Sequence, residues 1–299
     1  MRTLITGGKG LVGSAIESDF KPSRQQVDLM HVDNIIRYIT SNKIDSIIHC
    51  AGRVGGIKAN SEKPAEFFYE NIIINTNVLE AARATGVEKV VSFLSTCVFP
   101  DKATYPLTID QIHTGEPHTS NYAYAYAKRM VDVQSRAYRQ QYGCNFVTVI
   151  PCNIYGPNDN FNLDSGHVIP SLIHKCYLAK QNNTDLEVWG TGSPCREFLY
   201  SHDAGNIAKW VLKNYDEPDP LILSPDEGTS IATIASLVAY HMKFDGNIIY
   251  NGKQDGQYRK PSDSTRLGEL LPDYRFESIS TGIEKSVKWF IDNFKDARK

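Results

Sequence analysis

Three glycines at intervals of three residues, Gly7, Gly10 and Gly13, follow the first apolar segment of the chain. Residues 2–6 before them have the character of a strand, and the residues after them open a helical segment. A backbone without Cβ atoms can approach a pyrophosphate at the positive end of a helix, although a turn that only packs tightly is the alternative. The turn therefore predicts an α/β fold that binds a dinucleotide through Gly7, Gly10, Leu11, Val12 and Gly13.

Short β-branched runs alternate with helical segments through the first half of the chain. We expect strands at 2–6, 45–49, 89–94 and 145–150, and helices at 33–41, 66–85 and 122–142. Alternation of this kind builds a parallel sheet that is covered by helices on both faces. The fold class is therefore predicted to be α/β, with a Rossmann-type doubly wound parallel sheet.

The character of the sequence changes after Pro151, because turn-forming residues crowd the stretches 156–160 and 190–194. We expect a helix at 203–213 and, after it, a short apolar strand at 221–223 that rejoins the main sheet. We therefore predict two interleaved units. They are an NADP-binding Rossmann domain at 1–162 and 201–225, and a smaller α/β substrate-binding lobe at 163–200 and 226–299.

Charges near the glycine turn favour NADP over NAD. An NAD site usually places an acidic residue about 20 residues after the turn, whereas an NADP site places cations there. Lys9 and Arg24 are nearby cations, but Asp19 and Asp28 remain possible acidic contacts, and a single Lys or Arg is often only a solvated surface residue. We expect NADPH as the cofactor, with Lys9 and Arg24 at its 2′-phosphate.

Tyr124 and Lys128 lie four residues apart in the expected helix 122–142, and hence on one face. A phenol there can protonate a carbonyl oxygen that receives hydride, provided that a neighbouring ammonium lowers its pKa from about 10. Lys128 can also hold the nicotinamide ribose, and Ser95, just past the strand 89–94, can bind the same oxygen. An exposed helical pair is the alternative, because 16 tyrosines make a chance match easy. The predicted cofactor site also includes Tyr124, Lys128, Ala51 and Gly52.

Nearly the whole chain resembles the extended short-chain dehydrogenase/reductases, and among them most closely the GDP-L-fucose synthase family. The resemblance rests on seven segments: 53–60 (RVGGIKAN), 95–100 (STCVFP), 153–161 (NIYGPNDNF), 167–170 (HVIP), 188–192 (VWGTG), 196–198 (REF) and 259–260 (RK). The double-glycine and HVIP segments are far more specific than the Tyr–Lys spacing.

The resemblance implies a lobe that holds a GDP-linked keto sugar over the nicotinamide. By the same resemblance, Ser95, Tyr124 and Lys128 carry a reduction, and Cys97 and His167 carry an epimerisation. The positions that would line the substrate site are Asn153, Lys175, Trp189, Arg196 and Lys260. The family also implies a homodimer, formed through the long helices 66–85 and 122–142.

Several of these residues have a structural alternative. Cys97 could be a small core hydrophobe, and His167 could merely cap or pack a helix. Trp189 could belong to the core of the lobe, Lys175 to a solvated helix face, and Arg196 to an ion pair with a neighbouring acid.

The chain also departs from the family pattern. Its second-strand region is short, Lys175 stands where Arg is usual, and Pro261 and Ser262 replace commoner apolar residues.

Composition narrows the choice of partners. With 32 Lys and Arg against 34 Asp and Glu, the formal charge of −2 gives no basic field for nucleic acid. No apolar run reaches the roughly 20 residues of a membrane-spanning helix, so no membrane partner is expected. The six cysteines form no CxxC pair, which favours reduced thiols in the cytoplasm over disulfides or a metal site.

The leading prediction is an NADPH-dependent enzyme that epimerises a GDP-4-keto-6-deoxy-mannose-type sugar beside its ketone and then reduces that ketone, yielding GDP-L-fucose or a close analogue. Two alternatives stay open. One is a C4-reductase that has lost epimerisation, or that acts on a related sugar such as a heptose. The other is a non-catalytic dinucleotide-binding regulator, since a fold does not fix a function.

Overall fold

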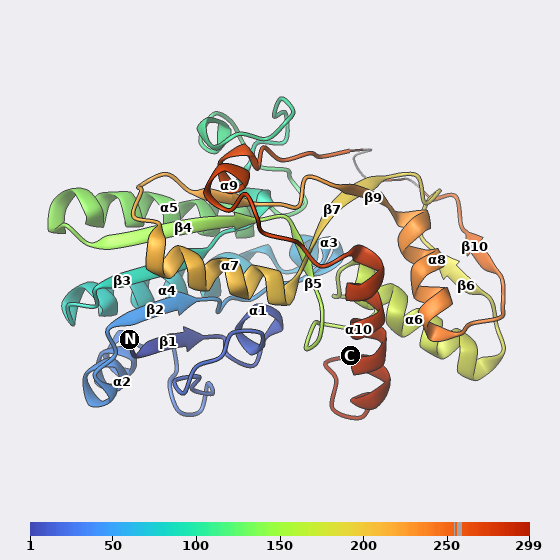
Figure 1. Cartoon of the computed structure of the whole chain (residues 1–299), viewed down its shortest axis with the longest axis horizontal. Coiled ribbons are helices and arrows are strands. Elements are labelled where there is room, and N and C mark those ends of the chain that lie inside the picture. The colour runs from blue at the N-terminus through green and yellow to red at the C-terminus, as the bar shows by residue number, and fades with distance from the viewer. Residues whose placement is uncertain (254, 256–258) are drawn as a thin grey trace.

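A five-stranded parallel sheet forms the centre of the larger part of the molecule (Figure 1). In the computed structural model, which describes residues 1–253, 255 and 259–299, the strand order is β1–β2–β3–β4–β8. The strands are β1 (Thr3–Thr6), β2 (Ser46–His49), β3 (Lys89–Phe93), β4 (Asn145–Pro151) and β8 (Leu221–Leu223). All neighbours pair in parallel, so the predicted strands and their parallel arrangement are confirmed.

Helices cover both faces of this sheet, and each face buries its own apolar cluster. On one face lie α2 (Val32–Asn42), α4 (Pro64–Ala84) and α5 (Tyr122–Tyr142), which pack over residues such as Leu4, Ile47 and Val90. On the other face lie α1 (Leu11–Ser14) and α7 (Ser201–Asn214), over Ile5, Ile48 and Val91. Adjacent residues of one strand point to opposite faces of the sheet. A sheet that is buried on both sides therefore needs uninterrupted apolar runs in its strands. The predicted doubly wound fold is confirmed.

The first helix and the second strand of a usual Rossmann sheet are strongly reduced. The helix α1 spans only four residues. In place of the second strand, a single β-bridge joins Leu4 and Phe20. The Ile5 amide donates to the Phe20 carbonyl at 2.9 Å, and the Ser18 hydroxyl donates to the Thr3 carbonyl at 2.6 Å. These two bonds satisfy part of the outer edge of β1, where a full strand would otherwise pair.

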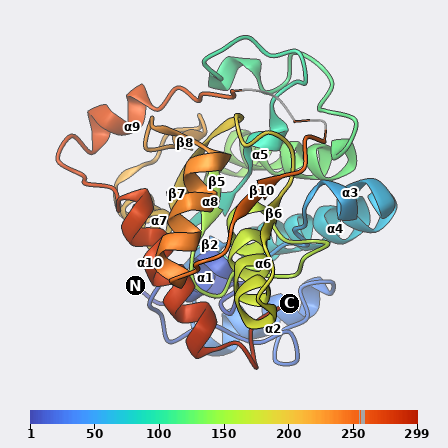
Figure 2. The same cartoon turned by 90° about the vertical axis from the view of Figure 1, so that its right-hand side faces the viewer.

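In the part of the chain that the structure describes, the smaller part of the molecule combines two short sheets with helices that pack against them (Figure 2). One sheet joins β5 (Asn153–Tyr155), β7 (Cys195–Tyr200) and β9 (Gly228–Ser230), and the other pairs β6 (Leu186–Val188) with β10 (Ile248–Tyr250). Their apolar sides and the helices α6 (Val168–Asn182), α8 (Ile231–Met242) and α10 (Ile279–Asp292) form a third core.

Four shorter elements connect these layers: α3 (Ile57–Glu62), α9 (Thr265–Leu270) and the 3-10 helices Thr96–Val98 and Ile109–Gln111. Leu267 of α9 belongs to the apolar cluster over β8. The predicted helix 203–213 and strand 221–223 are present as α7 and β8. The division at 1–162 with 201–225, and 163–200 with 226–299, stays a prediction.

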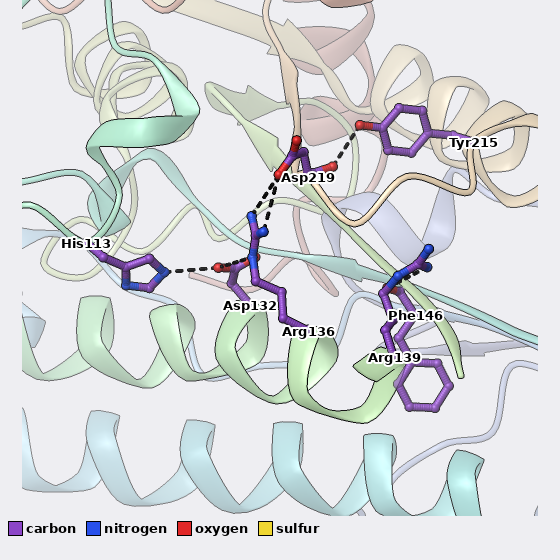
Figure 3. Close-up of polar contacts among 7 residues, drawn as sticks. All are labelled: His113, Asp132, Arg136, Arg139, Phe146, Tyr215 and Asp219. Carbon is purple, nitrogen blue, oxygen red and sulfur yellow. Dashed lines mark hydrogen bonds and ion pairs between the residues drawn. The ribbon is translucent and has the colours of Figure 1, made fainter. Parts of the chain in front are cut away.

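A buried carboxylate fixes the middle of α5, the helix that carries Tyr124 and Lys128. Asp132 accepts hydrogen bonds from His113 at 3.0 Å and from the Arg136 guanidinium at 3.0 and 3.1 Å (Figure 3). The same guanidinium reaches Asp219 at 3.2 Å, and the Tyr215 hydroxyl donates to the Asp219 carbonyl at 2.7 Å. The network ties α5 to the loop before it and to the connection between α7 and β8.

Among the described residues, none of the helices combines the length and apolar character that crossing a membrane requires.

Candidate active site

The glycine turn lies between the carboxyl ends of β1 and β2. Gly7 has φ +67°, a conformation that favours glycine, and a Cβ on it would lie 2.9 Å from the Ala51 Cα. A Cβ on Gly13 would lie 2.3 Å from the Gly7 carbonyl oxygen. Gly10 precedes α1, and its amide donates to the Gly7 carbonyl at 2.8 Å. Close packing thus explains the glycines at 7 and 13, and it leaves a backbone surface with no side chains where a pyrophosphate could rest.

Lys21 is a cation beside the glycine turn that sequence reasoning missed. It follows Phe20, and a Cβ on Gly8 would lie 2.6 Å from the Lys21 Cβ. Its ammonium donates to the Ser14 carbonyl at 3.4 Å, and burial lowers the pKa of Lys21. The two predicted cations, Lys9 and Arg24, are exposed. Lys21 comes directly after the residual second strand, and this position could have indicated a cation beside the turn. The segment is too short, however, to be recognised as a strand from the sequence.

Tyr124 and Lys128 form a buried pair, so the alternative of an exposed helical pair is wrong. Tyr124 is 8% and Lys128 4% exposed. The Lys128 ammonium donates to the Phe93 carbonyl at 2.9 Å, at the end of β3, and lies 5.9 Å from the centre of the Tyr124 ring. Ser95 follows β3 and begins the 3-10 helix Thr96–Val98, and its hydroxyl accepts from the Cys97 amide at 3.5 Å.

The expected lowering of the Tyr124 pKa is wrong for the protein alone. Burial raises the pKa of this phenol far above its ordinary value, and the neighbouring Cys97 raises it further. Burial also lowers the pKa of Lys128 to about 8, with partial compensation from Cys97 and Cys50. Loss of hydration disfavours the charged form of each group, the phenolate of Tyr124 and the ammonium of Lys128. Tyr124 is therefore fully protonated at neutral pH, as a proton donor must be.

Cys97 lies next to this pair and outside the apolar cores. The residue as a whole is of intermediate exposure, and it is not a member of the three apolar clusters. Burial raises the pKa of the thiol, while the Ser95 hydrogen bond and the charges of Lys260 and Lys128 lower it. The Lys260 ammonium donates to the Thr96 carbonyl at 3.3 Å. Two cations, Lys260 and Lys128, thus act on a thiol that lies close to the predicted proton donor.

His167 precedes the first residue of α6, as predicted, and much of its side chain is exposed. Its side chain makes no capping bond, so the alternative that it caps the helix is wrong. The surrounding protein disfavours the imidazolium and lowers the pKa of His167. The loop before it packs against the double-glycine segment through contacts of Ser165 and Gly166 with Gly56.

The predicted substrate residues come from separate elements of the smaller part. Trp189 is 59% exposed, so it is not lobe core, and the Lys253 ammonium lies 4.5 Å from its ring centre. Lys175 is a partly buried residue of α6, and the Asn153 amide donates to the Glu197 carbonyl at 2.9 Å. One small cavity is lined by Arg196, Lys260 and the neighbouring residues Cys195, Glu197, Gly228, Arg259 and Pro261.

Two buried polar residues that sequence reasoning missed shape this site. Asn71 is fully buried and holds both the amide and the carbonyl of Arg53, at 3.1 and 3.0 Å. Glu197 is 5% exposed and accepts from the Ser262 amide at 3.0 Å, two residues after Lys260. The predicted cofactor residues Ala51 and Gly52 follow β2, and a Cβ on Gly52 would lie 3.6 Å from the Lys128 ammonium.

Comparison with known proteins adds to this geometry. Residues 3–223 match the model of the NAD dependent epimerase/dehydratase family. A GDP-L-fucose synthase of Dictyostelium discoideum is 48% identical over 310 residues, covering 99% of this chain and 97% of its own, and one of Escherichia coli (strain K12) is 32% identical, covering 98% and 97%. A GDP-L-fucose synthetase of Naegleria fowleri bound to NADP is 39% identical, with a TM-score of 0.94 over 99% of this chain and 94% of that one.

Proposed function

Because this chain belongs to the NAD dependent epimerase/dehydratase family, and within it to the GDP-L-fucose synthases, we propose that it converts a GDP-4-keto-6-deoxy-mannose-type sugar to GDP-L-fucose or a close analogue. The enzyme is an NADP-dependent epimerase and reductase. The observation that carries the proposed chemistry is that Cys97 lies beside the buried pair of Tyr124 and Lys128, so a base candidate and a proton donor face one place.

The reduction needs a proton at the C4 oxygen. The turn of Gly7, Gly10 and Gly13 would hold the pyrophosphate of NADPH, which would supply the hydride for the ketone when bound. Tyr124 donates the proton to the C4 oxygen, and Ser95 holds that oxygen in place. Lys128, kept at the end of β3 by the Phe93 carbonyl, stabilises negative charge on the phenolate that remains.

The epimerisation uses the same carbonyl. Loss of a proton at C3 or C5 gives an enolate whose charge rests on the C4 oxygen, where Ser95 and Tyr124 hydrogen bonds stabilise it. We assign Cys97 as the base and His167 as the acid that returns a proton on the other face. Arg196 and Lys260, which share one cavity, would neutralise the diphosphate of the substrate, with Asn153, Lys175 and Trp189 as further contacts.

Product analysis tests this proposal directly. The protein is incubated with GDP-4-keto-6-deoxy-mannose and NADPH, and the product is identified by NMR. GDP-L-fucose as the product would support the proposed function. A C4-reduced sugar with unchanged configuration at C3 and C5 would instead support the reductase alternative, and NADPH binding without turnover would support the regulator.

We predict that NADPH binds more tightly than NADH, and that Lys21, Lys9 or Arg24 provides the discrimination. A charge-assisted hydrogen bond to a 2′-phosphate contributes about 1.5 to 3 kcal/mol, so replacing the main contact by alanine should weaken NADPH binding by about 10-fold or more. NADH binding should stay nearly unchanged. Fluorescence titration of each single variant with both cofactors identifies the residue. Equal affinity of the wild type for NADPH and NADH would contradict the prediction.

We infer that the protein is a homodimer that pairs α4 and α5 with their counterparts. Apolar residues are exposed on both helices, among them Tyr69 at 59% and Val133 at 44%. The two helices lie side by side, since the Gln134 amide donates to the Thr76 carbonyl at 3.4 Å. Exposed apolar surface is a common mark of protein interfaces.

Val133→Glu should therefore convert the dimer to a monomer, because a buried, unpaired carboxylate strongly disfavours an interface. Light scattering after size-exclusion chromatography measures the mass. Ile291→Glu is the matched control, since Ile291 is 45% exposed on α10, outside the proposed interface. A monomeric wild type, or a Val133→Glu variant that stays dimeric, would rule out this interface.

We also place the protein in the cytoplasm. All six cysteines are free thiols, as expected for a reducing compartment. Cell fractionation with antibody detection tests the location, and recovery with a secretory compartment would overturn it.

A further inference from the structure

The segment 52–60, which we name the glycine bridge, connects the buried Tyr124–Lys128 pair with the loop that carries His167. It runs from Gly52, past the double glycine, to Asn60 on α3. Its sequence is one of the most specific features of the chain, yet none of the chemistry above uses it. Its contacts at both ends suggest a role in the reaction.

The first end of the glycine bridge lies against the reductive residues. Gly52 faces Lys128, since a Cβ on Gly52 would lie 3.6 Å from the ammonium and 2.8 Å from the amide oxygen of buried Asn71. A Cβ on Gly55 would lie 3.0 Å from the end of the Phe67 ring. That ring packs edge-on against Tyr124, with 6.3 Å between the ring centres. The first end is therefore fixed relative to both reductive side chains.

The second end lies against the backbone just before His167. The Gly56 amide donates to the Ser165 carbonyl at 2.8 Å, and a Cβ on Gly56 would lie 3.0 Å from the Gly166 carbonyl oxygen. Gly166 has no room for a side chain either, because a Cβ on it would lie 2.5 Å from the Asn160 carbonyl oxygen. Two backbones thus meet without side chains between them, one residue before His167.

Polar contacts hold this junction from both sides. Buried Asn60 donates its amide to the carbonyls of Gly55 and Gly56 at 2.7 and 3.1 Å. Lys58 of α3 forms an ion pair of 2.7 Å with Asp164 of the opposite loop. The Asn162 side chain accepts from the Asp164 and Ser165 amides at 3.0 and 2.9 Å, so the loop is shaped before it meets the bridge.

We propose that the glycine bridge is a positioning element for epimerisation: it sets the distance of His167 from Cys97 and Tyr124, and Gly56 is the residue on which that distance depends. The inference rests on the proposed function, in which His167 returns a proton to the sugar. A displacement of about 1 Å at a reacting group can cost 10²-fold in rate, so a small side chain at the junction should matter. Reduction should depend on it far less, because the Tyr124–Lys128 pair is held by β3 and α5.

Gly56→Ala tests the proposal, because it keeps the amide donor and adds only the methyl group that meets the Gly166 carbonyl. Two rates are compared for the variant. The forward rate, from GDP-4-keto-6-deoxy-mannose and NADPH, needs epimerisation and reduction. The reverse rate, from GDP-L-fucose and NADP⁺, needs no epimerisation to form NADPH. We expect the forward rate to fall by about 10-fold to 100-fold and the reverse rate to change by less than about 2-fold.

Gly268→Ala is the matched control, because a Cβ at Gly268 in α9 meets nothing within 4 Å, and neither rate should change. The exposed ion pair gives a second test. Lys58→Asp and Asp164→Lys should each lower the forward rate by at most about 5-fold, and the double variant should restore it. Forward and reverse rates of Gly56→Ala that fall together, or that both stay at the wild-type value, would overturn the proposal. If the wild type forms product in D₂O without deuterium at C3 or C5, the result would instead contradict the proposed epimerisation itself.

Discussion

Replacing Tyr124 by phenylalanine is expected to lower the rate of ketone reduction by 10² to 10⁴-fold, while the fold and cofactor binding stay intact. The substitution removes only the hydroxyl that donates the proton, and general acid catalysis is typically worth about 3 to 5 kcal/mol of barrier. The ring stays in place because it packs edge-on against Phe67. NADPH consumption with the keto sugar measures the rate, and fluorescence titration with NADPH confirms binding.

Tyr122→Phe and Tyr126→Phe are the controls for this experiment. Both residues lie within two positions of Tyr124 on α5, but Tyr122 is 49% exposed and Tyr126 is only partly buried. Their variants should retain near-normal reduction, because it is Tyr124 whose ring lies beside Lys128 and whose hydroxyl is affected by Cys97. Near-normal turnover by Tyr124→Phe, with loss of activity in either control, would assign the proton donor to the other tyrosine.

Cys97→Ser should abolish epimerisation and leave reduction possible. The substitution replaces the thiol with a hydroxyl, which is a far weaker acid, so the thiolate base disappears while the volume of the side chain barely changes. The variant should still oxidise NADPH slowly against the unepimerised keto sugar, because the ring then presents the wrong configuration to Ser95 and Tyr124. In D₂O the wild type should incorporate deuterium at C3 and C5 of the product, and the variant should incorporate almost none, as mass spectrometry and NMR can measure.

Cys144→Ser is the control for the loss of a thiol as such. Cys144 is partly buried after α5 and packs against the apolar cluster under α2, α4 and α5, so its substitution should leave deuterium incorporation unchanged. His167→Gln should share the epimerisation defect of Cys97→Ser if the two residues work on opposite faces of the sugar. Full deuterium incorporation by Cys97→Ser would show that another group removes the protons.

The proton affinity of Cys97 depends on several parts of the chain. Burial raises the pKa of the thiol above its ordinary value, and the Ser95 hydroxyl, Lys260 and Lys128 offset only part of that rise. Lys260 is followed by a segment that Glu197 holds through the Ser262 amide. Residues distant in sequence, from the turn after β3, from α5 and from the segment before α9, therefore set the proton affinity of one side chain.

The sequence by itself was enough to predict the doubly wound sheet, the glycine turn, and the placement of Ser95 after a strand with Tyr124 and Lys128 on one helix face. These features follow from local periodicity and fixed spacing, which a linear pattern records directly. The same holds for His167 at the start of a helix, because the apolar spacing of the residues that follow it marks the helix.

Only the tertiary structure decided features that depend on which segments meet. Lys21 lies against the glycine turn because a second strand is reduced to the bridge at Phe20, and no local pattern marks such a contact. The pKa of Tyr124 rises rather than falls because burial disfavours the phenolate, and the degree of burial depends on packing. The junction of Gly56 with Ser165 joins residues that lie more than a hundred positions apart in the sequence. The glycine segment is visible in the sequence, but only the folded chain shows that a Cβ on Gly56 would meet the Gly166 carbonyl.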